Sequence, residues 1–491
     1  MSMKRMMMVA AIAAMLGGTR PVATAAMEKN DLKRNRKGDM KMMMKLLVAG
    51  LLATVTANVF SVTLYTNEVD GVKWVYSVSD GKATLGGGDA ASSAIVGNHS
   101  GKVEIPSFLG ETPVVAIANY AFNGNVGIKD LIVPEGITSI GDYAFQGCGG
   151  LTELILPEGL VTIGSYAFAN CGNLVSVTVP TTLVQIDGFA FSGCNDMERV
   201  NAKSLSAWCR IAFGNGRANP LYIDTNPQNG VLFFVNGVEV HDLVIPEDVT
   251  TLKRWAFFFC QSITSVTMHD GVTDIEKSAF NNCWNLTNVT FSANLKTIAS
   301  YAFSCSKMTD IYIPGSVDSI GYRAFDVSQS LTNLVIGGGV KSIESCAFID
   351  AKQLLRVVLP TSLTSFSTNA FSGCTVINEV TVPTDHWTMR QFFPDAYADI
   401  VSASVSPGSV SIRDSAFEKC GKLRSVLIAD TVSTIGGNAF RDCTAIESLD
   451  IPALVSEIAE DAFRGCSSIL AITVDDDNLA FKSIDGVLFT T

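Results

Sequence analysis

The dipeptide Ala-Phe recurs at a nearly constant spacing through most of this 491-residue chain. Successive motif phenylalanines are 23 residues apart, with one interval of 22, except where the interval widens to two or three periods. The motif phenylalanines are Phe122, Phe145, Phe168, Phe191, Phe257, Phe280, Phe303, Phe325, Phe348, Phe371, Phe417, Phe440 and Phe463. With the degenerate units in the wider intervals, the array has about 16 units. The chain is therefore a tandem repeat.

One complete unit, residues 144–164, shows how each repeat is expected to fold. Leu154-Ile155-Leu156 alternates as a strand does, with successive side chains on opposite faces. Pro157 cannot donate to a β-ladder and ends the strand, and Ile163-Gly164 predicts a second short extended piece. We expect the next Ala-Phe segment to form a helical or 3₁₀ turn on the opposite side. A 23-residue unit cannot bury its apolar stripe alone, so stacked units must share one core in a solenoid.

The repeat also resembles a known family. The pattern AFxxCxxLxxLxLPxxLxxIGxx resembles the BspA-like leucine-rich repeats of bacterial surface and secreted proteins, over roughly residues 101–475. The resemblance implies an α/β-type repeat solenoid, a right-handed coil with a parallel β-sheet face and short helical or irregular turns opposite. It also implies a non-enzymatic protein, because family members are generally surface proteins implicated in adhesion and protein binding.

The cysteines follow the repeat. Nine of the twelve stand three residues after a motif phenylalanine: Cys148, Cys171, Cys194, Cys260, Cys283, Cys374, Cys420, Cys443 and Cys466. Asn125, Ser328 or Ala351 takes this position in other units, so the position requires a small side chain. We interpret these cysteines as small buried residues able to donate a weak hydrogen bond to a backbone carbonyl. Disulfides between adjacent coils are the alternative, because neighbouring strands lie within disulfide reach.

The chain divides into three parts. Residues 1–57 are expected to be a leader and signal peptide, residues 58–100 an N-terminal β cap, and residues 101–491 the solenoid. Irregular repeats interrupt the solenoid at residues 201–242 and 383–406. The last residues resemble the opening of a further repeat, which predicts that the sequence is incomplete at its C-terminus.

The leader predicts export. A basic segment precedes an apolar stretch from Met42 to Ala57, with small residues at Val55-Thr56-Ala57, as in a secretory signal. Met40 or Met42 is then the expected true start, behind an over-extended gene start. The uninterrupted apolar run, residues 46–53, is too short to span a bilayer. The alternative is a cytoplasmic protein with an unusual leader.

Charge and composition exclude several function classes. Residues 58–491 carry 25 lysines and arginines against 44 acids, and such a surface repels phosphate backbones, so nucleic-acid binding is not expected. The four histidines are scattered, and His241-Asp242 and His269-Asp270 have no nucleophile in a suitable context. Asp475-Asp476-Asp477 superficially suggests calcium, but it lacks the glycine and distal Glu of an EF-hand. We expect no enzyme activity, cofactor or metal.

The outward-facing middle residues of the predicted strands are the first candidate binding surface. Among them are Thr178, Thr267, Thr290, Tyr312, Val335, Val358 and Thr381. Stacked coils would align them into a long exposed β-branched stripe, and large exposed apolar patches tend to be interaction sites. The alternative is that these residue types simply favour strands.

The irregular repeats supply the second candidate. Residues 383–406 are rich in aromatic residues, and Trp387 and Phe392 are candidate ligand contacts in a binding loop. An irregular repeat that buries these rings is the alternative. In residues 201–242, Asn236-Gly237 predicts a hairpin, either as a structural insert or as a ligand loop.

These observations predict an exported, non-enzymatic leucine-rich-repeat protein, secreted or at the cell surface, that mediates adhesion or binding. The expected partner is an extracellular or cell-surface protein or glycan, and the expected state is a monomer without a membrane span in the mature chain. A passive envelope scaffold is the first alternative. The second is the repeat portion of a longer protein with a catalytic or anchoring domain.

Overall fold

A computed structural model describes residues 62–97, 99–224 and 230–491. The predicted leader and signal peptide therefore lie outside the described residues. From Thr63 the chain forms one compact unit, a β-solenoid of about 16 turns. None of the helices in the described ranges is long and apolar enough to cross a membrane.

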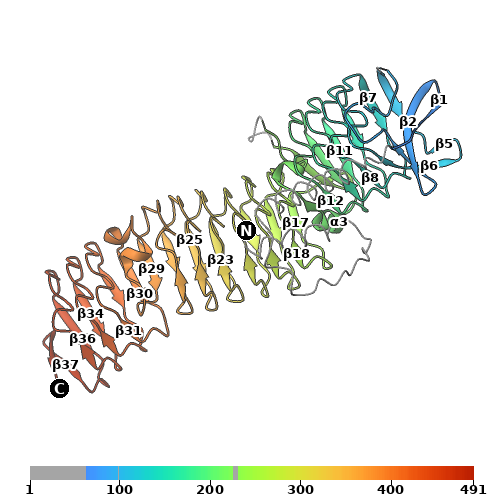
Figure 1. Ribbon diagram of the computed structural model, residues 1–491. Coiled ribbons are helices and arrows are strands. Elements are labelled where there is room, and N and C mark those ends of the chain that lie inside the picture. The colour runs from blue at the N-terminus through green and yellow to red at the C-terminus, as the bar shows by residue number, and fades with distance from the viewer. Residues whose placement is uncertain (1–61, 98, 225–229) are drawn as a thin grey trace, which may run out of the picture. The chain divides into compact units, whose positions relative to one another are not determined.

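An antiparallel meander begins the unit, as Figure 1 shows in blue. Its strands are β1 (Leu64–Val69), β2 (Val72–Ser79) and β3 (Lys82–Leu85). Trp74 of β2 is buried, and its ring lies edge-on to Phe122, 6.3 Å between centroids. Next come β4 (Gly101–Glu104), β5 (Phe108–Leu109) and β6 (Thr112–Ile117). Because β3 pairs with β6 in parallel, the meander continues directly into the stacked coils.

Each regular coil then contributes one strand to a first ladder. Most strands of successive coils pair in parallel and in register, side by side in Figure 1. The pairing is interrupted between Val235 and Asp242, between Thr290 and Asp310, and between Leu427 and Ser448. The strands are β7 (Ile128–Ile132), β9 (Glu153–Ile155), β11 (Ser176–Val179), β13 (Arg199–Ala202), β15 (Leu232–Val235), β17 (Asp242–Val244), β19 (Ser265–Thr267), β21 (Asn288–Thr290), β23 (Asp310–Ile313), β25 (Asn333–Ile336), β27 (Arg356–Val358), β29 (Glu379–Val382), β30 (Ser402–Val405), β32 (Ser425–Leu427), β34 (Ser448–Ile451) and β36 (Ala471–Val474).

A second ladder of two-residue strands is formed, in most units, by the segment that corresponds to Ile163-Gly164. It also pairs in parallel, for example β10 with β8 and β12. The strands are β8 (Ser139–Ile140), β10 (Thr162–Ile163), β12 (Gln185–Ile186), β14 (Ala212–Phe213), β18 (Thr251–Leu252), β20 (Asp274–Ile275), β22 (Thr297–Ile298), β24 (Ser319–Ile320), β26 (Ser342–Ile343), β28 (Ser365–Phe366), β31 (Ser411–Ile412), β33 (Thr434–Ile435) and β35 (Glu457–Ile458).

The Ala-Phe segment is a tight turn rather than the helical or 3₁₀ turn expected. In one coil Tyr143 and Gly147 both adopt left-handed backbone angles, φ 56° and 72°, which interrupt any helix. The N–H of Phe145 donates to the carbonyl of Ala167 in the next coil, at 2.7 Å. The turn therefore satisfies its backbone between coils, as a ladder does.

In the part of the chain that the structure describes, helix occurs only in the irregular repeats. The elements are α3 (Leu205–Arg210), η1 (Gly216–Ala218), α4 (Met389–Phe392) and η3 (Tyr397–Asp399). The hairpin predicted at Asn236-Gly237 is present, since β15 pairs antiparallel with β16 (Val238–Glu239). At the other end, β37 (Phe481–Ile484) and β38 (Val487–Thr490) form a further antiparallel hairpin.

Stacked phenylalanine rings form the centre of the core. Phe145 and Phe168 lie 5.2 Å apart with planes 1° from parallel, and both are fully buried. The same stack continues through most regular coils. Each regular unit places one apolar ring at the same position in the core, and this is the physical reason for the nearly constant spacing of the motif.

The cysteines hold the Ala-Phe turns of adjacent coils together. In seven coils the thiol donates to the carbonyl of the motif phenylalanine in the preceding coil, for example from Cys171 to Phe145 at 3.2 Å. Burial raises the pKa of Cys148 and Cys194 to about 12, so these thiols stay protonated donors. The interpretation as small buried residues is confirmed for eight of the nine cysteines, Cys466 being half-buried, and the twelve thiols are free.

Candidate functional site

The exposed face of the first ladder places the predicted outward residues in one line. Thr267 is in register with Thr290, and Tyr312 is in register with Val335, which in turn pairs with Val358. We call this line the outward row: Ile132, Ile155, Thr178, Asn201, Val244, Thr267, Thr290, Tyr312, Val335, Val358, Thr381, Ser404, Leu427, Asp450 and Thr473. Strand alternation explains the row, because β23 buries Ile311 and Ile313 and exposes Tyr312 between them.

Several members of the outward row are large apolar side chains open to solvent. Tyr312 is 64% exposed, Val244 63% and Leu427 69%. Thr267 and Thr290 are also exposed, whereas Val335, Val358 and Thr381 are half-buried by their neighbours. An apolar stripe of this kind, repeated at the spacing of strands, is suited to a macromolecular partner rather than to a small molecule.

A polar row runs beside the outward row, two residues earlier in each strand. It includes Glu153, Ser176, Arg199, Asp242, Ser265, Asp310, Arg356 and Glu379. Neighbouring coils bond along it, as Arg356 does with Glu379 at 2.9 Å and Ser265 with Asp242 at 2.6 Å. The face thus combines an apolar stripe with hydrogen-bonding groups, the composition of many protein interfaces.

A shallow hollow interrupts this face beside Thr178. Its volume is about 170 Å³, and Phe234 and Gly237 of the β15–β16 hairpin form one wall. The Arg199 guanidinium lies 4.8 Å from the Phe234 ring centroid, and Asn201 accepts a hydrogen bond from the Gly237 N–H at 2.9 Å. Sequence reasoning found the hairpin from Asn-Gly but missed Arg199 and Phe234, because nothing in the repeat places them over the sheet.

The aromatic residues of the second irregular repeat are mainly packed inward. Phe392 has no exposed surface, and its ring lies 4.9 Å from Phe366 at 74°. Trp387 is half-buried against the same cluster, 6.1 Å from Phe366. A fully buried side chain cannot contact a ligand in this conformation, so Phe392 contributes to the core. The Trp387 side chain is partly exposed to solvent, so it remains a candidate ligand contact.

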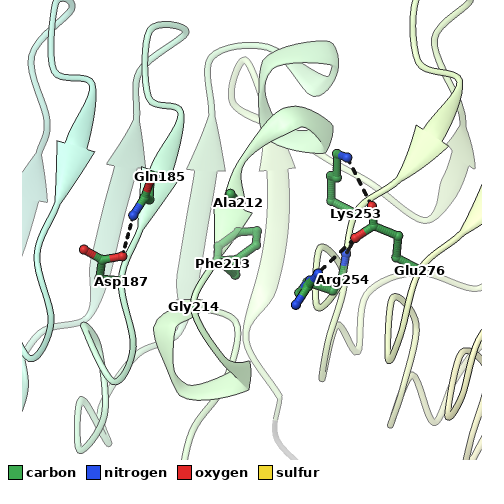
Figure 2. A pocket seen from close by; sticks show the side chains of 8 residues that line it. All are labelled: Gln185, Asp187, Ala212, Phe213, Gly214, Lys253, Arg254 and Glu276. Carbon is green, nitrogen blue, oxygen red and sulfur yellow. Dashed lines mark hydrogen bonds and ion pairs between the residues drawn. The ribbon is translucent and has the colours of Figure 1, made fainter. Parts of the chain in front are cut away.

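Two hollows lie where the second ladder is interrupted. The first hollow, of about 380 Å³, lies between β14 and β18 and is shown in Figure 2. Lys253 and Arg254 line it, but both contact Glu276: Lys253 Nζ lies 3.1 Å from Oε1 and Arg254 Nε 3.6 Å from Oε2. Across the hollow, the Gln185 amide donates to Asp187 at 2.6 Å. The charges of the first hollow are therefore largely neutralised internally.

The histidines bond to backbone rather than to a nucleophile. His269 Nε2 lies 3.0 Å from the Pro246 carbonyl and its Nδ1 accepts from the Gly271 N–H at 3.0 Å. His241 Nδ1 lies 3.0 Å from the Ser262 carbonyl. Within the described ranges, no group of three metal-ligating side chains comes together.

Comparisons with known proteins agree with the repeat pattern. A model described as a BspA-type leucine-rich repeat region of six copies matches residues 115–224, 232–355, 324–427 and 390–490, well over half of the chain. No curated protein matches.

Solved structures resemble the chain at low identity. A leucine-rich repeat protein from Bacteroides ovatus is 21% identical, over 84% of this chain and 89% of that one, with a TM-score of 0.43. A leucine-rich repeat protein from Eubacterium ventriosum is 19% identical, over 82% and 95%, with a TM-score of 0.34. A leucine-rich cell surface protein from Faecalibacterium prausnitzii is 20% identical, over 65% and 94%, with a TM-score of 0.32.

Proposed function

Since the chain belongs to the family of BspA-type leucine-rich repeat proteins, we propose that it is an exported bacterial adhesin. In this proposal the outward row binds an extracellular or cell-surface protein or glycan. No covalent chemistry is involved, and the protein acts as a monomer that displays a rigid face. The signal-like segment at residues 40–57 supports export.

The observation that carries the proposal is the register of the outward row. The strands repeat the same outward position coil after coil, and several of those positions hold exposed Tyr, Val, Leu and Ile side chains. Large exposed apolar patches on soluble proteins tend to be interaction sites. Many modest contacts along such a face can sum to a specific affinity without a deep pocket.

A binding screen with two matched variants tests the proposal. The purified protein is titrated against immobilised matrix proteins, mucins and glycans. The test variant carries Thr267→Glu, Thr290→Glu and Tyr312→Glu on the outward row. The control variant carries Val161→Glu, Val184→Glu and Val410→Glu, which are exposed beside the second ladder.

We expect saturable binding that the outward-row variant loses and the control variant retains. Each buried interface contact removed costs on the order of 1 kcal/mol or more, so three together should weaken binding at least about a hundredfold. Equal loss in both variants would place the binding surface elsewhere. A well-folded protein that binds nothing in the screen would favour a passive envelope scaffold.

A further inference from the structure

The second ladder is interrupted at two coils, and each interruption leaves a hollow. Among the described residues, the coils that begin with β15 and β29 contribute no second-ladder strand, so the ladder stops at β14 and β28 and resumes at β18 and β31. The first hollow lies at the first interruption. The second hollow, of about 450 Å³, lies at the other, between residues 388–397 of the irregular repeat and residues 413–419 of the next coil.

The residue that follows each second-ladder strand is small or acidic in most coils and basic at the two interruptions. In eleven of the thirteen coils from β8 to β35 this residue is Gly, Ala, Ser, Asp or Glu. In the two coils that resume the ladder it is a base, Lys253 or Arg413. In a regular coil this residue lies against the preceding coil, where the Gly164 N–H donates to the Ile140 carbonyl at 2.8 Å. At an interruption it lines a hollow instead, so each hollow has a base in its lining at this position.

The two hollows differ in how that charge is balanced. In the first hollow, Lys253 and Arg254 both contact Glu276, and Asp187 supplies a second negative charge. The second hollow is lined by Arg390, Arg413 and Lys419, and none of the three has a carboxylate within 4.0 Å among the described residues. This is unusual in a chain whose residues 58–491 carry 25 bases and 44 acids.

The two carboxylates of the second hollow are already engaged. Asp414 accepts a hydrogen bond from the Gly437 N–H at 2.7 Å. Glu418 faces Arg441, with the closest charged atoms 3.9 Å apart. Neither carboxylate forms an ion pair with a lining base, and the three bases outnumber the two acids, so the lining has a net positive charge that a bound anion would balance.

The hollow is held in shape by its own contacts. Thr388 caps α4 in a capping box, which fixes the backbone of Arg390. The Arg390 guanidinium lies 5.9 Å from the Tyr397 ring centroid, and Arg413 donates to the His386 carbonyl. Ser415 occupies the left-handed turn position at which Tyr143 carries a ring, so this coil leaves space there.

From this arrangement we propose that the second hollow binds the carboxylate of an acidic sugar. Guanidinium groups match a carboxylate in geometry and charge. The Tyr397 ring together with the Ser415 hydroxyl and the Gln391 amide suits a hydroxylated ring better than an apolar ligand. The volume fits a sugar rather than a lone ion. The proposal does not depend on the outward row, which lies on the first ladder.

Ligand titration tests the proposal on the full chain. N-Acetylneuraminic acid and glucuronic acid are titrated by calorimetry and saturation-transfer NMR at fixed ionic strength, with N-acetylglucosamine and sodium sulfate as comparison probes. The test variants are Arg390→Glu and Lys419→Glu, both at exposed side chains. Arg254→Gln, in the neutralised first hollow, is the matched control. Thermal melting verifies that each variant is folded.

We expect saturable binding of at least one of the two acids and none of the neutral sugar. Each test variant should weaken that binding about tenfold or more, because a charge-assisted hydrogen bond is lost, and Arg254→Gln should leave it unchanged. Four results would overturn the proposal: no saturable binding of either acid, equal binding of the neutral sugar, sulfate binding as tight as that of the acids, or undiminished binding by both folded test variants. None of these results bears on the outward row, so this proposal and the adhesin proposal can fail separately.

Discussion

Replacing Ser328 with cysteine should stabilise the solenoid. Ser328 and Ser306 stand three residues after a motif phenylalanine, where seven other coils carry a hydrogen-bonded thiol. Both serine hydroxyls are buried and have no hydrogen-bond partner among the described residues. The C–O bond of serine is shorter than the C–S bond of cysteine, and the hydroxyl does not reach the carbonyl that the thiol reaches in other coils.

The magnitude follows from the unsatisfied hydroxyl. A buried polar group without a partner costs about 1–3 kcal/mol, and Ser328 is fully buried. Cysteine removes this cost and adds a thiol that, at the distances seen elsewhere, lies 2.9–3.2 Å from its acceptor. Alanine, found at the equivalent position as Ala351, removes the hydroxyl. It leaves empty the space that the sulfur of a cysteine would fill. The expected order of stability at position 328 is therefore Cys, then Ala, then Ser.

Urea unfolding of the three proteins under reducing conditions measures this order. We expect Ser328→Cys to raise the unfolding free energy by about 1–3 kcal/mol, with Ser328→Ala between the two. The reciprocal change Cys171→Ser should lower it by a similar amount. If the wild-type protein with Ser328 is more stable than both variants, the conclusion that the cysteine thiols hold adjacent Ala-Phe turns together is wrong.

Three further changes probe the core and its thiols. Phe168→Ala should cost about 3–5 kcal/mol of unfolding free energy, because it removes a fully buried ring from the stack; urea denaturation measures it. Gly164→Ala should cost about 1–3 kcal/mol by thermal melting, since a Cβ there would lie 2.6 Å from the Asp142 backbone nitrogen. Burial raises the pKa of Cys148 and Cys194 from 9.0 to about 12, so the folded state holds their protons more tightly than the unfolded state. The stabilisation of the folded state that these two protonated thiols provide is complete below pH 9 and is lost as the pH rises toward 12. Melting temperatures measured over a pH series should therefore decline between pH 9 and pH 12. At pH 8 both thiols should react with a thiol reagent only after denaturation.

The repeat period predicted the fold because it is set by backbone geometry and one buried ring. Alternation around Ile155 corresponds to strand pairing between coils, and the small residue at Cys148 corresponds to a thiol contact that recurs in seven coils. The Ala-Phe turn was the exception. Its left-handed residues include Tyr143, which nothing in the sequence marks as a left-handed position.

The candidate surfaces were predictable only where they follow the period. The outward row follows from strand alternation and parallel register, so its members could be named from sequence. The contact between Arg199 and Phe234 could not, and the burial of Phe392 was one of two interpretations that the sequence left open, because both depend on how an irregular segment packs against regular coils. The second hollow was missed for the same reason, since Arg390 and Arg413 are 23 residues apart across a coil that lacks its second strand.

Site-specific crosslinking tests the central claim most directly. A photoreactive amino acid is placed at Tyr312 on the outward row in one protein and at Val184 beside the second ladder in another, both at exposed positions. Each protein is irradiated with mucin and matrix proteins, with and without excess unlabelled chain as competitor. The account predicts a competable crosslink from position 312 and none from position 184. A competable crosslink from position 184 alone would contradict it.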